Sequence, residues 1–127
     1  MKFIVQSSKS FEITCQDLQS AVTANSFGVL HIHDIRETMG KKGVQFDKNV
    51  RVFEVCNPHK AKDALNISME ICMALPCRVS VWEQDGEVKI GMISPVSTIN
   101  MACDCNEAKA MGEEVERIMK KIINDTK

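Results

Sequence analysis

Two cysteines near strand ends are the residues of this chain best placed for chemistry. Cys56 closes an extended run that stops at Asn57-Pro58, and Cys77 opens another directly after Pro76. If these strands are antiparallel neighbours, both thiols lie at one end of the sheet, on its valine-bearing face. Such a pair binds a soft metal ion such as zinc or copper, forms a reversible disulfide, or acts as nucleophile and resolving thiol. Packing of two small core residues is the plainer alternative.

Three histidines are the remaining candidate metal ligands. His31 and His33 lie two residues apart on a predicted strand, so both imidazoles share one face, and His59 follows Cys56 by three residues. The spacing matches no standard zinc finger. We expect His31 and His33 to point outward as solvated or interface residues, with Leu30 and Ile32 inward.

A second cysteine pair, Cys103-Asp104-Cys105, precedes the last predicted helix. Two cysteines one residue apart close a poor disulfide ring, so the sequence leaves open an exposed metal-binding or oxidation-prone pair and an incidental one.

Charge and hydropathy exclude several classes of protein. Sixteen basic and seventeen acidic side chains in 127 residues give a net charge of -1, which provides no overall field to attract nucleic acid or anionic membrane. The first residues lack the apolar core of a signal peptide, and no apolar run approaches the roughly 18 residues that cross a bilayer. We therefore expect one cytoplasmic domain, residues 1–127, whose six cysteines are reduced thiols.

The elements that position these residues follow from the apolar periodicity. Ser10 is a predicted cap for the first helix, and Asn57 with Pro58 begins a short one. Strands are predicted around residues 3–5 and over 29–35, 49–56, 77–84 and 87–93. Helices are predicted over 11–22, 59–65 and 107–124, with one helical turn within 37–42.

Asp85-Gly86 is a strong hairpin signal. A two-residue turn there pairs Val81 with Ile90 and gives an α+β domain with its helices on one face of a mostly antiparallel sheet. Phe53, Ser80 and Trp82 are assigned to the opposite, open face. Because large exposed apolar side chains usually mark interfaces, we expect this face to form a homodimer.

Four stretches carry a resemblance to a known family: GVLHIHDIRETMGKKGVQFD, EVCNP, ALPCRVSVWEQDGEV and SPV. They resemble domain of unknown function 302 over nearly the whole chain. The resemblance implies a β-α-β(4)-α domain with a curved sheet, similar to one repeat of the TATA-box-binding protein and often homodimeric. It implies no established activity, and its likeness to a nucleic-acid-binding architecture is analogy of fold alone.

The leading hypothesis is a non-enzymatic, homodimeric binding domain that takes a small molecule or a soft metal ion near Cys56 and Cys77. Two alternatives stay open. One is a thiol-based redox or transfer enzyme that uses the same two cysteines, and the other is a purely structural dimerisation module.

Overall fold

A five-stranded antiparallel sheet forms the centre of the molecule, with strand order β1-β5-β4-β3-β2. The computed structural model describes all 127 residues. The strands are β1 (Lys2–Ser7), β2 (Gly28–Asp34), β3 (Val50–Cys56), β4 (Cys77–Gln84) and β5 (Glu87–Ile93). The predicted β-α-β(4)-α order and the hairpin register, with Val81 opposite Ile90, are confirmed.

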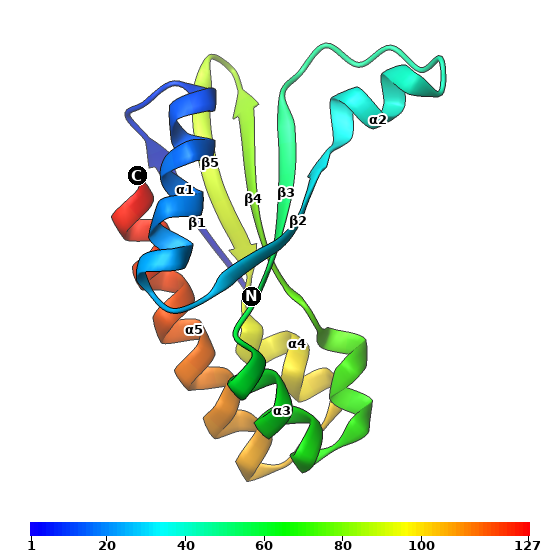
Figure 1. Ribbon diagram of the computed structural model, residues 1–127, viewed down its shortest axis with the longest axis vertical. Helices are drawn as coiled ribbons and strands as arrows, with labels where there is room; N and C mark the ends of the chain where they lie inside the picture. The colour runs from blue at the N-terminus through cyan, green and yellow to red at the C-terminus, as the bar shows by residue number, and fades with distance from the viewer.

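The helices form two groups around this sheet (Figure 1). They are α1 (Phe11–Ala24), α2 (Ile35–Lys41), α3 (Pro58–Ile67), the 3₁₀ helix η1 (Met69–Ala74), α4 (Pro95–Ala102) and α5 (Asn106–Thr126). The two long helices α1 and α5 cover one face, as predicted. The short helices α3, η1 and α4 gather at one end of the sheet, and α4 was absent from the predicted elements.

Local sequence signals explain where the helices begin. The side chain of Ser10 accepts a hydrogen bond from the backbone N–H of Ile13, which caps α1. Asn57 caps α3 in the same way by accepting from the N–H of Lys60, and Pro58 occupies the first turn, where its missing N–H has no consequence. Both caps confirm the sequence-based expectation.

The main core lies between the sheet and the helices α1 and α5. Phe53 is fully buried there, and it pairs with Val79 across the ladder. The assignment of Phe53 to the open face is therefore wrong. Side chains directly opposite each other on neighbouring strands share a face, so the register that puts Val79 inward also puts Phe53 inward.

A smaller second core joins the short helices to α5. Its fully buried members are Ala64, Ile71, Ile99 and Ala108. Gly112 of α5 permits a close approach of α4, because a Cβ at Gly112 would lie 3.0 Å from the Cα of Val96. This core fixes η1 and α4 at the end of the sheet.

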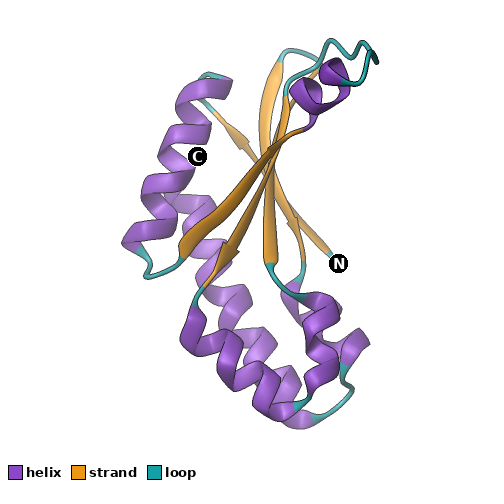
Figure 2. Ribbon diagram, turned by 45° about the vertical axis from the view of Figure 1, so that its right-hand side comes forward, coloured by secondary structure: helices purple, strands orange, loops and turns teal.

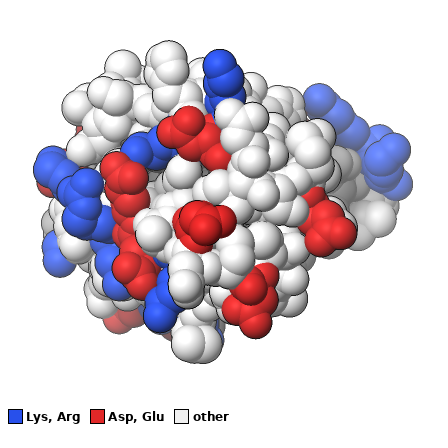
Figure 3. Space-filling model, turned by 90° about the horizontal axis from the view of Figure 1, so that it is seen from below, with Lys and Arg blue, Asp and Glu red and all other residues white.

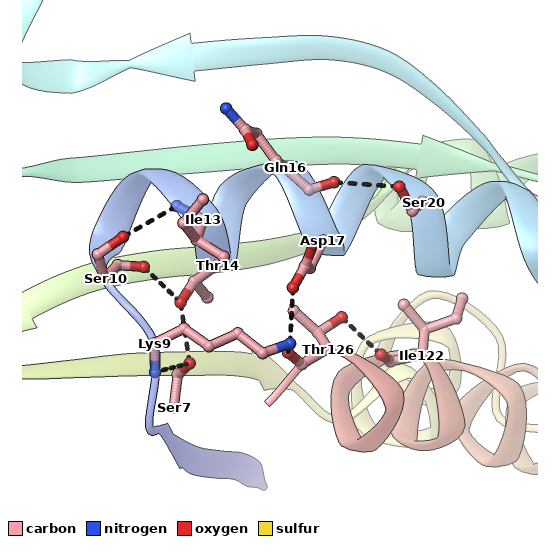
Figure 4. Close-up of polar contacts among 10 residues, drawn as sticks. All are labelled: Ser7, Lys9, Ser10, Ile13, Thr14, Gln16, Asp17, Ser20, Ile122 and Thr126. Carbon is pink, nitrogen blue, oxygen red and sulfur yellow. Dashed lines mark hydrogen bonds and ion pairs between the residues drawn. The ribbon is translucent and has the colours of Figure 1, made fainter.

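Polar contacts tie the N-terminal segment to the C-terminal helix (Figure 4). The hydroxyls of Ser7 and Thr14 lie 2.9 Å apart. The ammonium of Lys9 donates to Asp17 at 2.6 Å and to the backbone carbonyl of Thr126 at 2.8 Å. The end of α5 is therefore held against the start of α1.

Surface carboxylates should make the fold less stable in acid. Their pKa values are lowered by hydrogen bonds: Glu12 by Arg51, Glu114 by Lys60, Glu116 by Ser94, and Asp125 by Lys121. Because each folded-state pKa lies below the unfolded one, the stabilisation is present above the ordinary value, 4.5 for a glutamate, and is lost as the pH falls through the folded-state pKa.

We expect the urea concentration at the unfolding midpoint to decrease as the pH is lowered from about 6 to about 3, and to decrease less steeply in Glu12→Gln. Arg51 makes two hydrogen bonds to Glu12, at 2.8 and 3.0 Å, which the amide variant weakens. Identical pH profiles for the two proteins would contradict this assignment.

The helix α5 begins without a side-chain cap. Cys105 occupies the N-cap position and makes no capping hydrogen bond. A serine hydroxyl accepts from an N–H of the first turn, so Cys105→Ser should raise the free energy of unfolding by about 0.5–1 kcal/mol in urea denaturation. Cys103→Ser, outside the helix, is the matched control and should give no such gain; equal effects in both variants would argue against capping.

Candidate functional site

The face of the sheet opposite α1 and α5 carries a hollow of about 760 Å³. In Figure 2 this face has no helix over its centre, with α2 beside one end and the short helices beside the other. The floor includes Val52, Ser80 and Ile93 from three neighbouring strands, and the walls include Met73 of η1 and Met101 of α4. A mostly apolar concave surface of this size suits a small organic ligand.

A few polar side chains project into the hollow. His33 and Glu54 lie on adjacent strands, and the imidazole Nε2 is 2.8 Å from a carboxylate oxygen of Glu54. Arg78 of β4 lies directly opposite Glu54 of β3, yet it takes part in none of the molecule's eight ion pairs. The hollow therefore offers one guanidinium that no carboxylate neutralises.

The predicted outward orientation of Ser80 and Trp82 is confirmed. Ser80 lines the hollow, and Trp82 lies farther along the same strand. A Cβ at Gly91 would lie 3.0 Å from the Trp82 ring and from Ile4, so the absence of a side chain at Gly91 lets the indole lie across β5. Trp82 is half-buried by its own sheet, and its indole N–H donates to Gln84 at 3.2 Å.

Cys56 and Cys77 lie close together at the end of the sheet, but on different faces. Cys77 pairs with Val55 and packs against the core, which leaves Cys56, the next residue of β3, pointing to the opposite side. The expectation that both thiols share the valine face is therefore wrong. It failed because Val52 faces outward while Val79 faces inward.

The two thiols nevertheless border one small cavity under α3. Its volume is about 30 Å³, enough for a water-sized occupant and too small for an organic ligand. Burial raises the pKa of Cys77 to about 11, with a further contribution from Cys56, and burial also raises the pKa of Cys56. Since the thiolate is the nucleophile, these environments oppose redox chemistry.

Native alkylation should rank the cysteines by environment. The rise in the pKa of Cys77 from 9.0 to about 11 lowers its thiolate fraction about 100-fold, whereas Cys72 is exposed on η1. We expect iodoacetamide to modify Cys72 rapidly, and Cys77 and buried Cys15 only on unfolding, as read by peptide mass spectrometry. Alkylation of native Cys77 at the rate of Cys72 would restore the thiol-enzyme hypothesis.

The histidines do not converge with these cysteines on one centre. His31 stacks edge-on against His33, with ring centroids 4.4 Å apart, and His59 is exposed on α3. The structure gathers no group of three or more His, Cys, Asp or Glu side chains suited to a metal ion. Ile32 packs toward the core as predicted, but Leu30 is exposed because the β2–β3 register shifts between Val29 and His31.

Cys103 and Cys105 come together in the link between α4 and α5. Their sulfurs are 3.1 Å apart. This contact raises the pKa of Cys103, and Glu70 of η1 and the N-cap residue of that helix, Ser68, lie beside it. Both side chains are half-buried free thiols.

The sequence and the fold place the chain in a family. The model of "Domain of unknown function DUF302" matches residues 3–126. This protein belongs to the DUF302 family. The crystal structure of an uncharacterized conserved protein DUF302 from Bacillus stearothermophilus has a TM-score of 0.94 to this DUF302 domain at 26% identity, over 99% of this chain and 98% of the other. None of the curated proteins matches the chain.

Sequence reasoning missed the two walls of the hollow in this DUF302 domain. The start of α4 was indicated by Ser94-Pro95, since a serine cap before a proline is typical of the start of a helix. Ser94 does cap α4, by accepting a hydrogen bond from the N–H of Ser97. Met73 and Met101 are 75% and 86% exposed, which no periodicity would reveal. None of the helices is long and apolar enough to span a bilayer.

Proposed function

We propose that this DUF302 domain binds a small organic anion with an apolar body in the hollow on the uncovered face of its sheet. The volume of about 760 Å³ falls within the roughly 300–1,000 Å³ typical of small-molecule sites. The lining supports the same class of ligand, because apolar side chains from β3, β4, β5, η1 and α4 surround a few polar groups.

The observation that carries the proposal is the unpaired guanidinium of Arg78. His33 and Glu54 already satisfy each other at 2.8 Å, so Arg78 is left as the group that can pair with a ligand. A guanidinium presents a planar fork of donors that matches a carboxylate, sulfonate or phosphate. An anionic head at Arg78 would direct the apolar body toward Val52 and the methionines.

Anilinonaphthalene sulfonate is a suitable probe because it combines an aromatic body with one anionic group. We expect saturable binding of one molecule per native chain, seen as enhanced fluorescence. Ser80→Trp places an indole on the floor of the hollow and should abolish this binding without unfolding the domain. Equal binding by Ser80→Trp and the original protein would refute the proposal.

The cysteine-centred functions receive less support. The cavity bordered by Cys56 and Cys77 measures only about 30 Å³, and the raised pKa of Cys77 keeps that thiol protonated at neutral pH. We therefore propose that the ligand binds in the larger hollow, which Cys77 borders from one side, and not in the space between these cysteines.

Homodimer formation is a second proposal, and exposed isoleucines support it. Ile4 of β1 is 43% exposed and Ile93 of β5 is 61% exposed, and both lie on the uncovered face. We propose that two copies pair through the edge of this face at β1, beside the hollow, so that Arg78 and Ser80 stay open to a ligand. Sedimentation should show a dimer that Ile4→Asp converts to monomers, with exposed Ile13→Asp on α1 as the matched control; a monomer before any substitution would refute the pairing.

A further inference from the structure

The link between α4 and α5 holds two thiols that the proposed hollow does not use. The Cys103 and Cys105 sulfurs lie 3.1 Å apart as free thiols, one on each side of Asp104. This separation lies well beyond the S–S bond length of about 2.05 Å, and a small outward movement admits an ion between the sulfurs. Both cysteines are only half-buried, so an ion can approach them from solvent.

We propose that Cys103 and Cys105 form a two-coordinate site for a soft monovalent cation, Cu(I). Thiolate sulfur selects Cu(I) over hard cations, and Cu(I) is stable with two ligands. On binding, each thiol releases its proton to solvent and each sulfur donates an electron pair to the ion. The positive ion thereby lowers the charge of the dithiolate from two negative charges to one.

The number of available ligands separates Cu(I) from Zn²⁺. Structural zinc takes four ligands, and catalytic zinc takes three from the protein. No third His, Cys, Asp or Glu is gathered with this pair into a metal-binding group. Two thiolates alone therefore meet the requirement of Cu(I) and fall short of that of zinc.

The surrounding charges favour a cation over reaction with an anionic disulfide. Asp104 separates the two cysteines, Glu70 lies beside Cys103, and Glu107 stands in the first turn of α5. Figure 3, which views the molecule from this helical end, shows acidic side chains across the middle of the surface and basic side chains mostly toward its edges. Carboxylates this close to the pair attract a cation and repel an anionic substrate such as oxidised glutathione.

The site is tested by competition between the reduced protein and a coloured Cu(I) chelator under anaerobic conditions. The original chain and Cys72→Ser, which removes an exposed thiol on η1, should each withdraw one equivalent of Cu(I). Either Cys103→Ser or Cys105→Ser should weaken this uptake by more than about tenfold, because the second thiolate no longer acts within the same chelate.

Circular dichroism establishes that each variant is folded. Three results would overturn the proposal: no withdrawal of Cu(I) by the original chain, undiminished withdrawal by the double variant Cys103→Ser/Cys105→Ser, or equally tight uptake of Zn²⁺ by the pair. The first result would mean that the two cysteines are ordinary thiols. The second would mean that other thiols, such as Cys56 and Cys77, bind the Cu(I).

Discussion

Replacing Phe53 by alanine should lower the free energy of unfolding by about 3–5 kcal/mol, the largest loss expected from a single change in this protein. Phe53 is fully buried opposite Val79, under the helices α1 and α5. The substitution removes apolar contacts and leaves a cavity that the rigid sheet cannot fill. Urea unfolding followed by circular dichroism measures the loss.

Val52→Ala is the matched control, because the neighbouring residue of β3 points to the uncovered face and is only half-buried. Its cost should stay below about 1.5 kcal/mol. If Phe53→Ala is too unstable to measure, Phe53→Leu keeps most of the volume and should cost about 1–2 kcal/mol. A Phe53→Ala loss no greater than that of Val52→Ala would contradict the inward placement of Phe53.

Replacing Arg78 by glutamine should weaken the binding of anilinonaphthalene sulfonate by about tenfold or more. A hydrogen bond to a charged group contributes about 1.5–3 kcal/mol, and Arg78 is the group in the hollow free to make one. Arg78→Lys keeps the charge but loses the planar fork, so its affinity should lie between those of the other two proteins. Fluorescence titration gives the three dissociation constants.

Lys89→Gln provides the control for charge. Lys89 lies on the same face, paired with Trp82, but outside the residues that line the hollow. The two glutamine variants change the net charge equally, so a general effect of charge would weaken the binding of the probe equally in both. Equal affinities in Arg78→Gln and Lys89→Gln would remove Arg78 from the site.

The order of elements could be read from the chain because local signals agreed with the fold. Ser10 and Asn57 cap the helices that follow them, and Asp85-Gly86 turns the β4–β5 hairpin in the expected register. Each signal depends on residues within one turn of each other, which a sequence displays directly.

The face of the sheet on which each side chain lies was harder to predict. It depends on the register between strands that are distant in sequence. The error at Cys56 came from grouping valines of β3 and β4 together, although Val52 lies opposite Ser80 and not opposite Val79. The hollow itself depends on η1 and α4, which the second core holds in place through Ile71 and Ile99. Such packing between distant segments leaves no pattern in either segment alone.

The most direct test of the proposed binding function is a crystal structure of the protein with anilinonaphthalene sulfonate. We expect the aromatic body to lie between Val52 and Met101, with the sulfonate within hydrogen-bonding distance of the Arg78 guanidinium. Probe bound elsewhere on the surface, with the hollow beside Ser80 vacant, would contradict the account.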